Sequence, residues 1–200
     1  ILHIQKKYLE SSKLLQKANN LKLKLKPFNP EYLIKKSKNL LIESNKQIIL
    51  SDQVRNNYEN IFITGMPRSG TTLVESIISI NKNVLDLGET NILEESFLES
   101  KKALGKKSLS EVYTNKIKCF NSKLTITTNK WLYNYLYAGI IANQLPNSKI
   151  IYCFRNPLDN ILSIYRAHFS SGNEYASSLK DCAKVYLHHE EIINIYTKQY

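Results

Sequence analysis

The chain has 200 residues, which is enough for one domain or for one domain with a helical flank. Its formal net charge is +11, and most of the excess lies in residues 1–50, which hold 11 lysines and 3 glutamates. This lysine-rich flank indicates a solvated helical face or, as the alternative, a surface for an acidic partner or nucleic acid. No aromatic RNA-binding pattern or zinc-finger spacing supports nucleic-acid binding. No apolar run approaches the ~20 residues of a membrane span.

The flank itself predicts two helices. Apolar residues at three- and four-residue spacing favour an amphipathic helix over residues 4–25. Pro27 and Pro30 disfavour helix immediately before them, so the second helix is expected over residues 30–48.

From residue 58 the pattern changes to short strands that alternate with helices. Strands are predicted at 60–64, 84–87, 124–128 and 148–154, and helices at 71–80, 89–100, 109–120, 133–145, 157–169 and 175–199. This alternation predicts the α/β class, with a P-loop-like three-layer domain around a central parallel sheet. We place this domain at residues 53–200, after a helical lead-in over residues 1–52, and expect it to be truncated at its carboxyl end.

A glycine-rich turn, "GMPRSGTT" at residues 65–72, joins the first predicted strand to the next helix. Gly65 and Gly70 have the spacing of a P-loop, whose backbone N–H groups and helix N-terminus bind an anion. Thr71 stands where a P-loop has the lysine that serves the γ-phosphate of ATP, and no aspartate at a predicted strand end offers a site for Mg²⁺. The loop is therefore predicted to hold a terminal phosphate that is not itself transferred, without an obligatory metal. The alternative is a tight turn whose hydroxyl groups cap the helix.

Two segments resemble a known family, the sulfotransferases that use 3′-phosphoadenosine 5′-phosphosulfate (PAPS). "GMPRSGTTLVE" is similar to the 5′-phosphosulfate loop of that family, and "IIYCFRNPLDNILSIYRAHF" is similar to its 3′-phosphate segment. The resemblance covers roughly residues 55–200. It is strongest to bacterial sulfotransferases with an N-terminal tetratricopeptide array, and then to the tyrosylprotein sulfotransferases. The segment "LLQKANNLKLK" also resembles the helical lead-in of the bacterial proteins.

The resemblance implies two groups of cofactor-binding residues. The residues implied for the 5′-phosphosulfate are Arg68, Ser69, Gly70, Thr71 and Thr72. The residues implied for the 3′-phosphate are Arg155 and Ser163. An arginine suits this role because its guanidinium offers phosphate a rigid fork of donors. The alternatives are a surface ion pair for Arg155 and an ordinary helix-surface position for Ser163.

The resemblance also implies catalytic roles for Glu89, Lys130 and Arg68. Glu89 in "LDLGET" matches the catalytic glutamate of the tyrosylprotein relatives, and a carboxylate there can take the proton of the acceptor. Its alternative role is to cap the following helix. Lys130 in "TTNKW" matches a lysine near the leaving phosphate, with a solvated lysine as the alternative. Asn129 replaces the usual aspartate, so we expect Lys130 to be held less firmly.

The predicted activity is transfer of a sulfuryl group from PAPS to a hydroxyl, of protein tyrosine or a saccharide, or to an amine. A nucleotide or small-molecule kinase with a degenerate P-loop is one alternative. A non-catalytic fragment that binds a protein partner through the helical flank is another. The sequence leaves the acceptor open.

The remaining reactive side chains predict no further site. His168, His188 and His189 are expected to be structural, because no partner motif accompanies them. The three cysteines at positions 119, 153 and 182 are far apart and form no C-x-x-C motif. This favours a reducing, cytoplasmic location and argues against disulfides or a zinc site.

Overall fold

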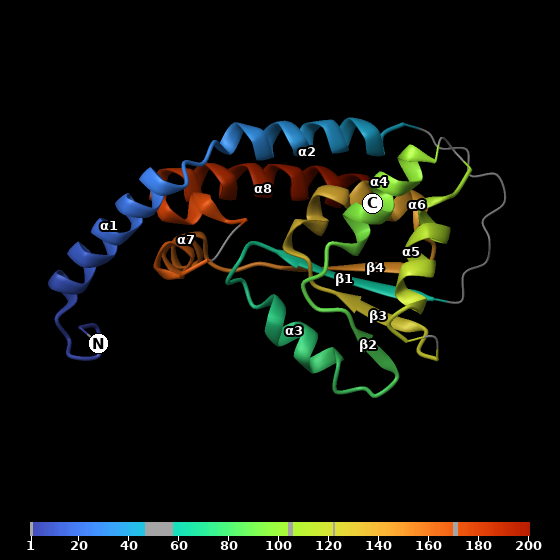
Figure 1. Cartoon of the computed structure of the whole chain (residues 1–200), viewed down its shortest axis with the longest axis horizontal. Coiled ribbons are helices and arrows are strands. Elements are labelled where there is room, and N and C mark those ends of the chain that lie inside the picture. The colour runs from blue at the N-terminus through green and yellow to red at the C-terminus, as the bar shows by residue number, and fades with distance from the viewer. Residues whose placement is uncertain (1, 47–57, 104–105, 122, 170–171) are drawn as a thin grey trace. The chain divides into compact units, whose positions relative to one another are not determined.

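The computed structural model describes residues 2–46, 58–103, 106–121, 123–169 and 172–200 (Figure 1). The elements follow in the order α1 (Tyr8–Leu25), α2 (Pro30–Ser44), β1 (Glu59–Gly65), α3 (Thr71–Ile78), β2 (Val84–Asp86), α4 (Ile92–Lys102), α5 (Leu109–Lys118), β3 (Ile126–Asn129), the 3₁₀ helix η1 (Leu132–Tyr137), α6 (Ala138–Gln144), β4 (Ser148–Cys153), α7 (Pro157–Arg166), the 3₁₀ helix η2 (Glu174–Ser177) and α8 (Leu179–Gln199). The predicted boundary between residues 52 and 53, and the predicted end of the second helix at 47–48, lie outside the described residues.

The chain forms two compact units, which we describe separately. One unit comprises the described residues up to Lys36 together with Asn156–Glu191. The other comprises Ser37–Arg155 together with Ile192–Tyr200 and contains the described sheet. The division into a lead-in and a sulfotransferase domain remains a prediction.

The sheet has four parallel strands in the order β2-β3-β1-β4. In register, Phe62 of β1 lies opposite Asn129 of β3, and Gly65 lies opposite Cys153 of β4. The strands therefore end at one edge, and this edge carries the glycine loop and Lys130. The predicted α/β class with a central parallel sheet is confirmed.

Apolar side chains make β1 the centre of the packed core. Phe62 and Ile63 are fully buried on opposite faces of the strand, as expected where helices cover both faces of a parallel sheet. The Phe62 ring packs on Tyr113 of α5 with the ring centroids 5.7 Å apart, and Ile140 and Ile141 of α6 are also buried.

The crossover helices divide between the two faces of the sheet. Figure 1 shows α3 on one side and α4, α5 and α6 on the other. The loops after the neighbouring strands β1 and β3 thus turn to opposite faces. In open α/β sheets, ligands bind in the crevice that forms at such a point, outside the carboxyl ends of the strands.

The other unit packs α1 beside the segment around α7 and η2. Asn19 of α1 donates from Nδ2 to the carbonyl of Tyr165 at 3.1 Å, and Lys22 donates to the carbonyl of Phe169 at 2.8 Å. Phe28 packs on Tyr175 of η2 with centroids 5.6 Å apart. Within the described ranges, no helix combines the length and the apolar character that crossing a membrane requires.

Most predicted elements are confirmed with small shifts at their ends. The largest shift that affects function is at α4, which begins at Ile92 rather than at residue 89. Glu89 and Thr90 therefore belong to the loop after β2. The predicted helix at 133–145 begins as the 3₁₀ helix η1 and becomes α6 only at Ala138.

Candidate functional site

The loop between β1 and α3 is held by backbone conformations that suit glycine. Gly65 has φ +153°, and a Cβ atom there would lie 2.3 Å from the carbonyl oxygen of Cys153. Gly70 has φ +103° and precedes α3. Arg68 also adopts a positive φ, of 68°, which costs a non-glycine residue energy and is typical of functional loops.

The same loop offers hydrogen-bond donors to an anion. Gly70 at the N-cap of α3 supplies no side-chain cap, which leaves N–H groups of the first turn for another acceptor. The hydroxyl of Ser69 is buried and has no hydrogen-bond partner among the described residues. Helix capping by the loop hydroxyls does not account for these donors, whereas phosphate oxygens fit them.

The structure brings two of the predicted cofactor residues together at this edge. Arg155 follows β4, and its Nη1 donates to the carbonyl of Arg68 at 3.4 Å. Both arginines are exposed. Ser163 lies half-buried on α7, in the other compact unit, and its contact with a 3′-phosphate remains a prediction.

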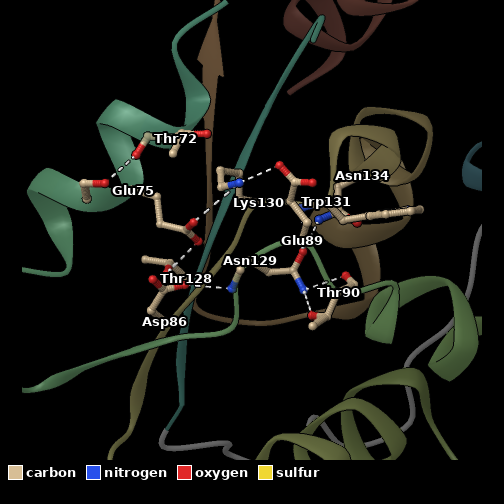
Figure 2. A network of polar contacts seen from close by, with 12 residues as sticks. Thr72, Glu75, Asp86, Glu89, Thr90, Thr128, Asn129, Lys130, Trp131 and Asn134 are labelled. Carbon is tan, nitrogen blue, oxygen red and sulfur yellow. Dashed lines mark hydrogen bonds and ion pairs between the residues drawn. The ribbon is translucent and has the colours of Figure 1, made fainter. Parts of the chain in front are cut away.

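Lys130 and Glu89 form an ion pair at the ends of β3 and β2. Figure 2 shows the Lys130 ammonium between two carboxylates. Its Nζ lies 2.7 Å from Oε1 of Glu89 and 3.8 Å from Oε2 of Glu75. The Lys130 side chain is 8% exposed, whereas that of Glu89 is 56% exposed. The carboxylate of Glu89 therefore faces solvent.

Backbone hydrogen bonds fix the relative position of this pair. The N–H of Leu87 donates to the carbonyl of Thr128 at 3.0 Å, and the N–H of Lys130 donates to the carbonyl of Gly88 at 2.9 Å. These bonds continue the parallel ladder of β2 and β3 beyond Asp86, the last residue of β2. They hold the segment with Glu89 against the segment with Lys130.

Glu75 on α3 is the buried member of the cluster. It is 4% exposed, and its Oε1 accepts a hydrogen bond of 3.2 Å from Thr128 Oγ1. Burial raises the pKa of Glu75 to about 7, and the negative charge of Asp86 adds to this rise. Lys130 and Thr128 act in the opposite direction, because they stabilise the carboxylate.

Asn129 supports the loop that carries Glu89. Its Nδ2 donates to the carbonyl and the hydroxyl oxygen of Thr90, at 3.1 and 3.0 Å. Its Oδ1 accepts from the N–H of Trp131 at 3.1 Å and from Nδ2 of Asn134 at 2.5 Å. The loop position of Glu89, and the N-cap of α4 at Asn91, also argue against Glu89 as a helix cap.

One sequence-based expectation is corrected here. Lys130 was expected to be held less firmly because Asn129 replaces an aspartate, but Glu75 and Glu89 both pair with it. β2 ends at Asp86 rather than at the predicted residue 87, so an aspartate lies at this strand end. The Asp86 carboxylate accepts the N–H of Gly88 at 2.7 Å.

Glu75 was missed by the sequence analysis, although a signal for it exists. Thr71 and Glu75 are four residues apart and therefore share one face of α3, and both are buried. A carboxylate on the buried face of a short apolar helix needs a partner, and this requirement is visible in the sequence.

The other reactive residues form no second site. His188 and His189 are buried in α8, and burial lowers the pKa of His189. His168 is exposed and follows α7 rather than lying within it. Cys153 and Cys182 are buried and Cys119 is exposed, and all three are free thiols. Among the residues that the structure describes, no group of three or more histidines, cysteines or acidic residues is arranged to bind a metal.

Comparison with known proteins agrees with the fold. The family model of the sulfotransferase domain matches residues 58–200, which is more than half of the sequence. The chain belongs to this sulfotransferase family, as the resemblance predicted.

One relative is an uncharacterised protein of Aquifex aeolicus (strain VF5). It is 31% identical to this chain over 131 residues, which is 56% of the chain and 17% of the length of the relative. The chain thus matches only a small part of that protein. The closer resemblance to tetratricopeptide-containing and tyrosylprotein sulfotransferases remains an expectation.

Proposed function

We propose that this site transfers a sulfuryl group from PAPS to a hydroxyl or amine acceptor and releases adenosine 3′,5′-bisphosphate. The observation that carries the proposal is the ion pair between Glu89 and Lys130 at the carboxyl edge of the sheet that also carries the glycine loop. The hydrogen bond of 3.2 Å from Thr64 Oγ1, just before the loop, to the carbonyl of Leu132 supports this arrangement.

The loop residues are proposed to hold the phosphosulfate end of PAPS. Arg68, Ser69 and the N-terminus of α3 fit an anion. They combine one cation, backbone N–H groups and a buried hydroxyl that has no hydrogen-bond partner in the described part of the chain. The other residues assigned to this end are Gly70, Thr71 and Thr72. Arg155 and Ser163 are proposed to hold the 3′-phosphate.

The proposed chemistry uses Glu89 as general base and Lys130 as a fixed positive charge. PAPS supplies the activated sulfuryl group, and its phosphate is the leaving group. Glu89 takes the proton from the acceptor O–H or N–H while the acceptor atom forms its bond to sulfur. The bond from sulfur to the bridging oxygen breaks, and its electron pair stays on the phosphate. Lys130 and Arg68 stabilise the charge that develops there.

The acceptor class stays open between protein tyrosine, a saccharide and a small-molecule hydroxyl or amine. Glu89 is more than half exposed, which suits acceptors of different size. We also keep as predictions a cytoplasmic location and a protein partner that binds through the helical flank.

The 3′-phosphate provides the sharpest test of this function. In the full-length protein, adenosine 3′,5′-bisphosphate should bind at least tenfold more tightly than 5′-AMP, which corresponds to about 1.4 kcal/mol or more. Arg155→Ala should remove most of this preference, and Ser163→Ala should reduce it by about 1 kcal/mol, as for one hydrogen bond to a charged group. Titration calorimetry with both nucleotides measures these differences.

This test has a matched control variant and an outcome that would favour the kinase alternative. Arg166→Ala removes an exposed arginine near the end of α7 and should leave the preference unchanged. If the wild type binds the two nucleotides equally, the 3′-phosphate site is absent. ATP hydrolysis that depends on Mg²⁺ would then favour the nucleotide or small-molecule kinase.

A further inference from the structure

The two carboxylates that flank Lys130 differ in what they can reach. The side chain of Glu89 is 56% exposed and is open to an acceptor, whereas that of Glu75 is 5% exposed. Glu75 therefore cannot act on a substrate directly. Its Oε2 lies 3.8 Å from Lys130 Nζ, so it can affect the site through its ion pair with Lys130.

Glu75 is itself fixed from three elements. It projects from α3, one turn after the residue that begins that helix, and accepts a hydrogen bond from Thr128 of β3. The charged groups that face it are Lys130 after β3 and Asp86 at the end of β2. Figure 2 shows Glu75 directed from α3 toward Thr128 and Lys130. It thus connects the helix of the phosphate loop to the catalytic lysine.

The amide of Asn129 does not provide this contact. Both of its polar atoms are engaged with the segment after Gly88 and with the start of η1, as described above. The negative charge that an aspartate would place next to Lys130 in the sequence comes instead from a residue 55 positions earlier in the chain.

We propose that Glu75 is a positioning residue that holds the Lys130 ammonium at the site of sulfuryl transfer and replaces the carboxylate that position 129 lacks. This inference rests on the proposed function. The pKa of Glu75 of about 7 has a further consequence. As the pH falls below 7, Glu75 takes up a proton, and the hold on Lys130 weakens.

The first test separates positioning from folding by kinetics. Glu75→Gln keeps the size of the side chain and removes its charge. With PAPS as donor and p-nitrophenol as probe acceptor, kcat should fall about 10- to 100-fold, the scale of a misplaced catalytic group. KM for PAPS and affinity for adenosine 3′,5′-bisphosphate should change by less than about twofold. Glu111→Gln, an exposed glutamate on α5, is the control and should keep the wild-type kcat.

A double-mutant cycle shows whether Glu75 acts through Lys130. In a Lys130→Ala background, Glu75→Gln should lower kcat by less than about twofold further, because the group it positions is gone. The kcat–pH profile of the wild type should also contain an inflection near pH 7 that Glu75→Gln lacks. A full additional loss in the Lys130→Ala background would overturn the inference, and so would an unchanged kcat.

A second measurement needs no acceptor. Carbon NMR of the Glu75 carboxyl, assigned by its absence in Glu75→Gln, follows the titration directly. Lys130→Ala and Thr128→Val should each raise its pKa, since both side chains stabilise the carboxylate. Lys118→Ala, which removes an exposed lysine on α5, should not. An unchanged titration in Lys130→Ala would contradict the proposed contact. If the wild type instead binds no adenosine 3′,5′-bisphosphate, the proposed function fails, and the titration still decides whether Glu75 holds Lys130.

Discussion

The glycine loop and the carboxylate–lysine cluster meet at one edge of the sheet, but they are built in different ways. The loop is eight consecutive residues, and the groups proposed to bind an anion are mostly backbone N–H groups set by glycine conformations. The cluster consists of side chains from α3 and from the segments after β2 and β3. The proposed binding is thus encoded in one short motif, whereas the proposed chemistry depends on tertiary packing.

The strongest test of this contrast is removal of the proposed base. In the full-length protein, Glu89→Gln keeps the shape of the side chain but cannot take a proton. Turnover of PAPS should fall ~10²- to 10⁴-fold, the usual contribution of a general base. Affinity for adenosine 3′,5′-bisphosphate should change by no more than about twofold, because the loop does the binding. Calorimetry and a steady-state assay of the same preparation measure both quantities.

Glu95→Gln is the matched control for this variant. Glu95 is also exposed, but it lies in the first turn of α4 and pairs with Lys116 at 3.3 Å. This variant should keep wild-type turnover. Survival of turnover in Glu89→Gln would mean that the base lies elsewhere.

A substitution in the loop should instead weaken binding of the nucleotide. Arg68 is the cation within residues 65–72, so Arg68→Ala should weaken binding of adenosine 3′,5′-bisphosphate by roughly 1.5–3 kcal/mol, the scale of a charge-assisted hydrogen bond. Titration calorimetry measures the change, and circular dichroism checks the fold. Unchanged affinity in a folded variant would show that this loop does not hold the nucleotide.

The two loop glycines should differ in how well they tolerate a side chain. Gly65→Ala must place a Cβ 2.3 Å from the carbonyl oxygen of Cys153 and should lower the free energy of unfolding by roughly 1–3 kcal/mol. Gly70→Ala has no atom within 4 Å of its Cβ and pays only for its positive φ, about 1 kcal/mol. Urea denaturation compares the two variants. Equal losses would mean that the close approach at Gly65 is relaxed in solution.

A further test concerns the pH dependence of stability. Glu75 has a pKa of about 7 in the folded protein against an ordinary value of 4.5, so the folded state binds a proton that the unfolded chain releases. Between about pH 4.5 and 7 this group therefore makes stability fall as the pH rises, by at most ~1.4 kcal/mol per pH unit. Glu75→Gln should remove this contribution. Urea unfolding of the wild type and of Glu75→Gln at pH 5, 6 and 7 tests this contribution. If the free energy of unfolding changes with pH in the same way in both proteins, the contribution is absent.

Sequence reasoning reaches the loop more easily than the cluster for a physical reason. The positions of Gly65, Gly70 and Arg68 follow from local rules about strand, turn and helix, and the alternation of elements predicts the parallel sheet. Glu89 and Lys130 came from the resemblance to the family, motif by motif. Glu75 could not be paired with Lys130 in this way, because their contact depends on how α3 packs against β3.

The ladder of hydrogen bonds beyond the end of β2 also bears on how this site can change over evolutionary time. The bonds of Leu87 and Lys130 to the carbonyls of Thr128 and Gly88 join main-chain atoms, which every residue type except proline supplies. The register of Glu89 against Lys130 is thus insensitive to most substitutions around it. If the proposed function holds, a new acceptor preference can arise by substitutions in surrounding loops without any change in the register of Glu89 against Lys130.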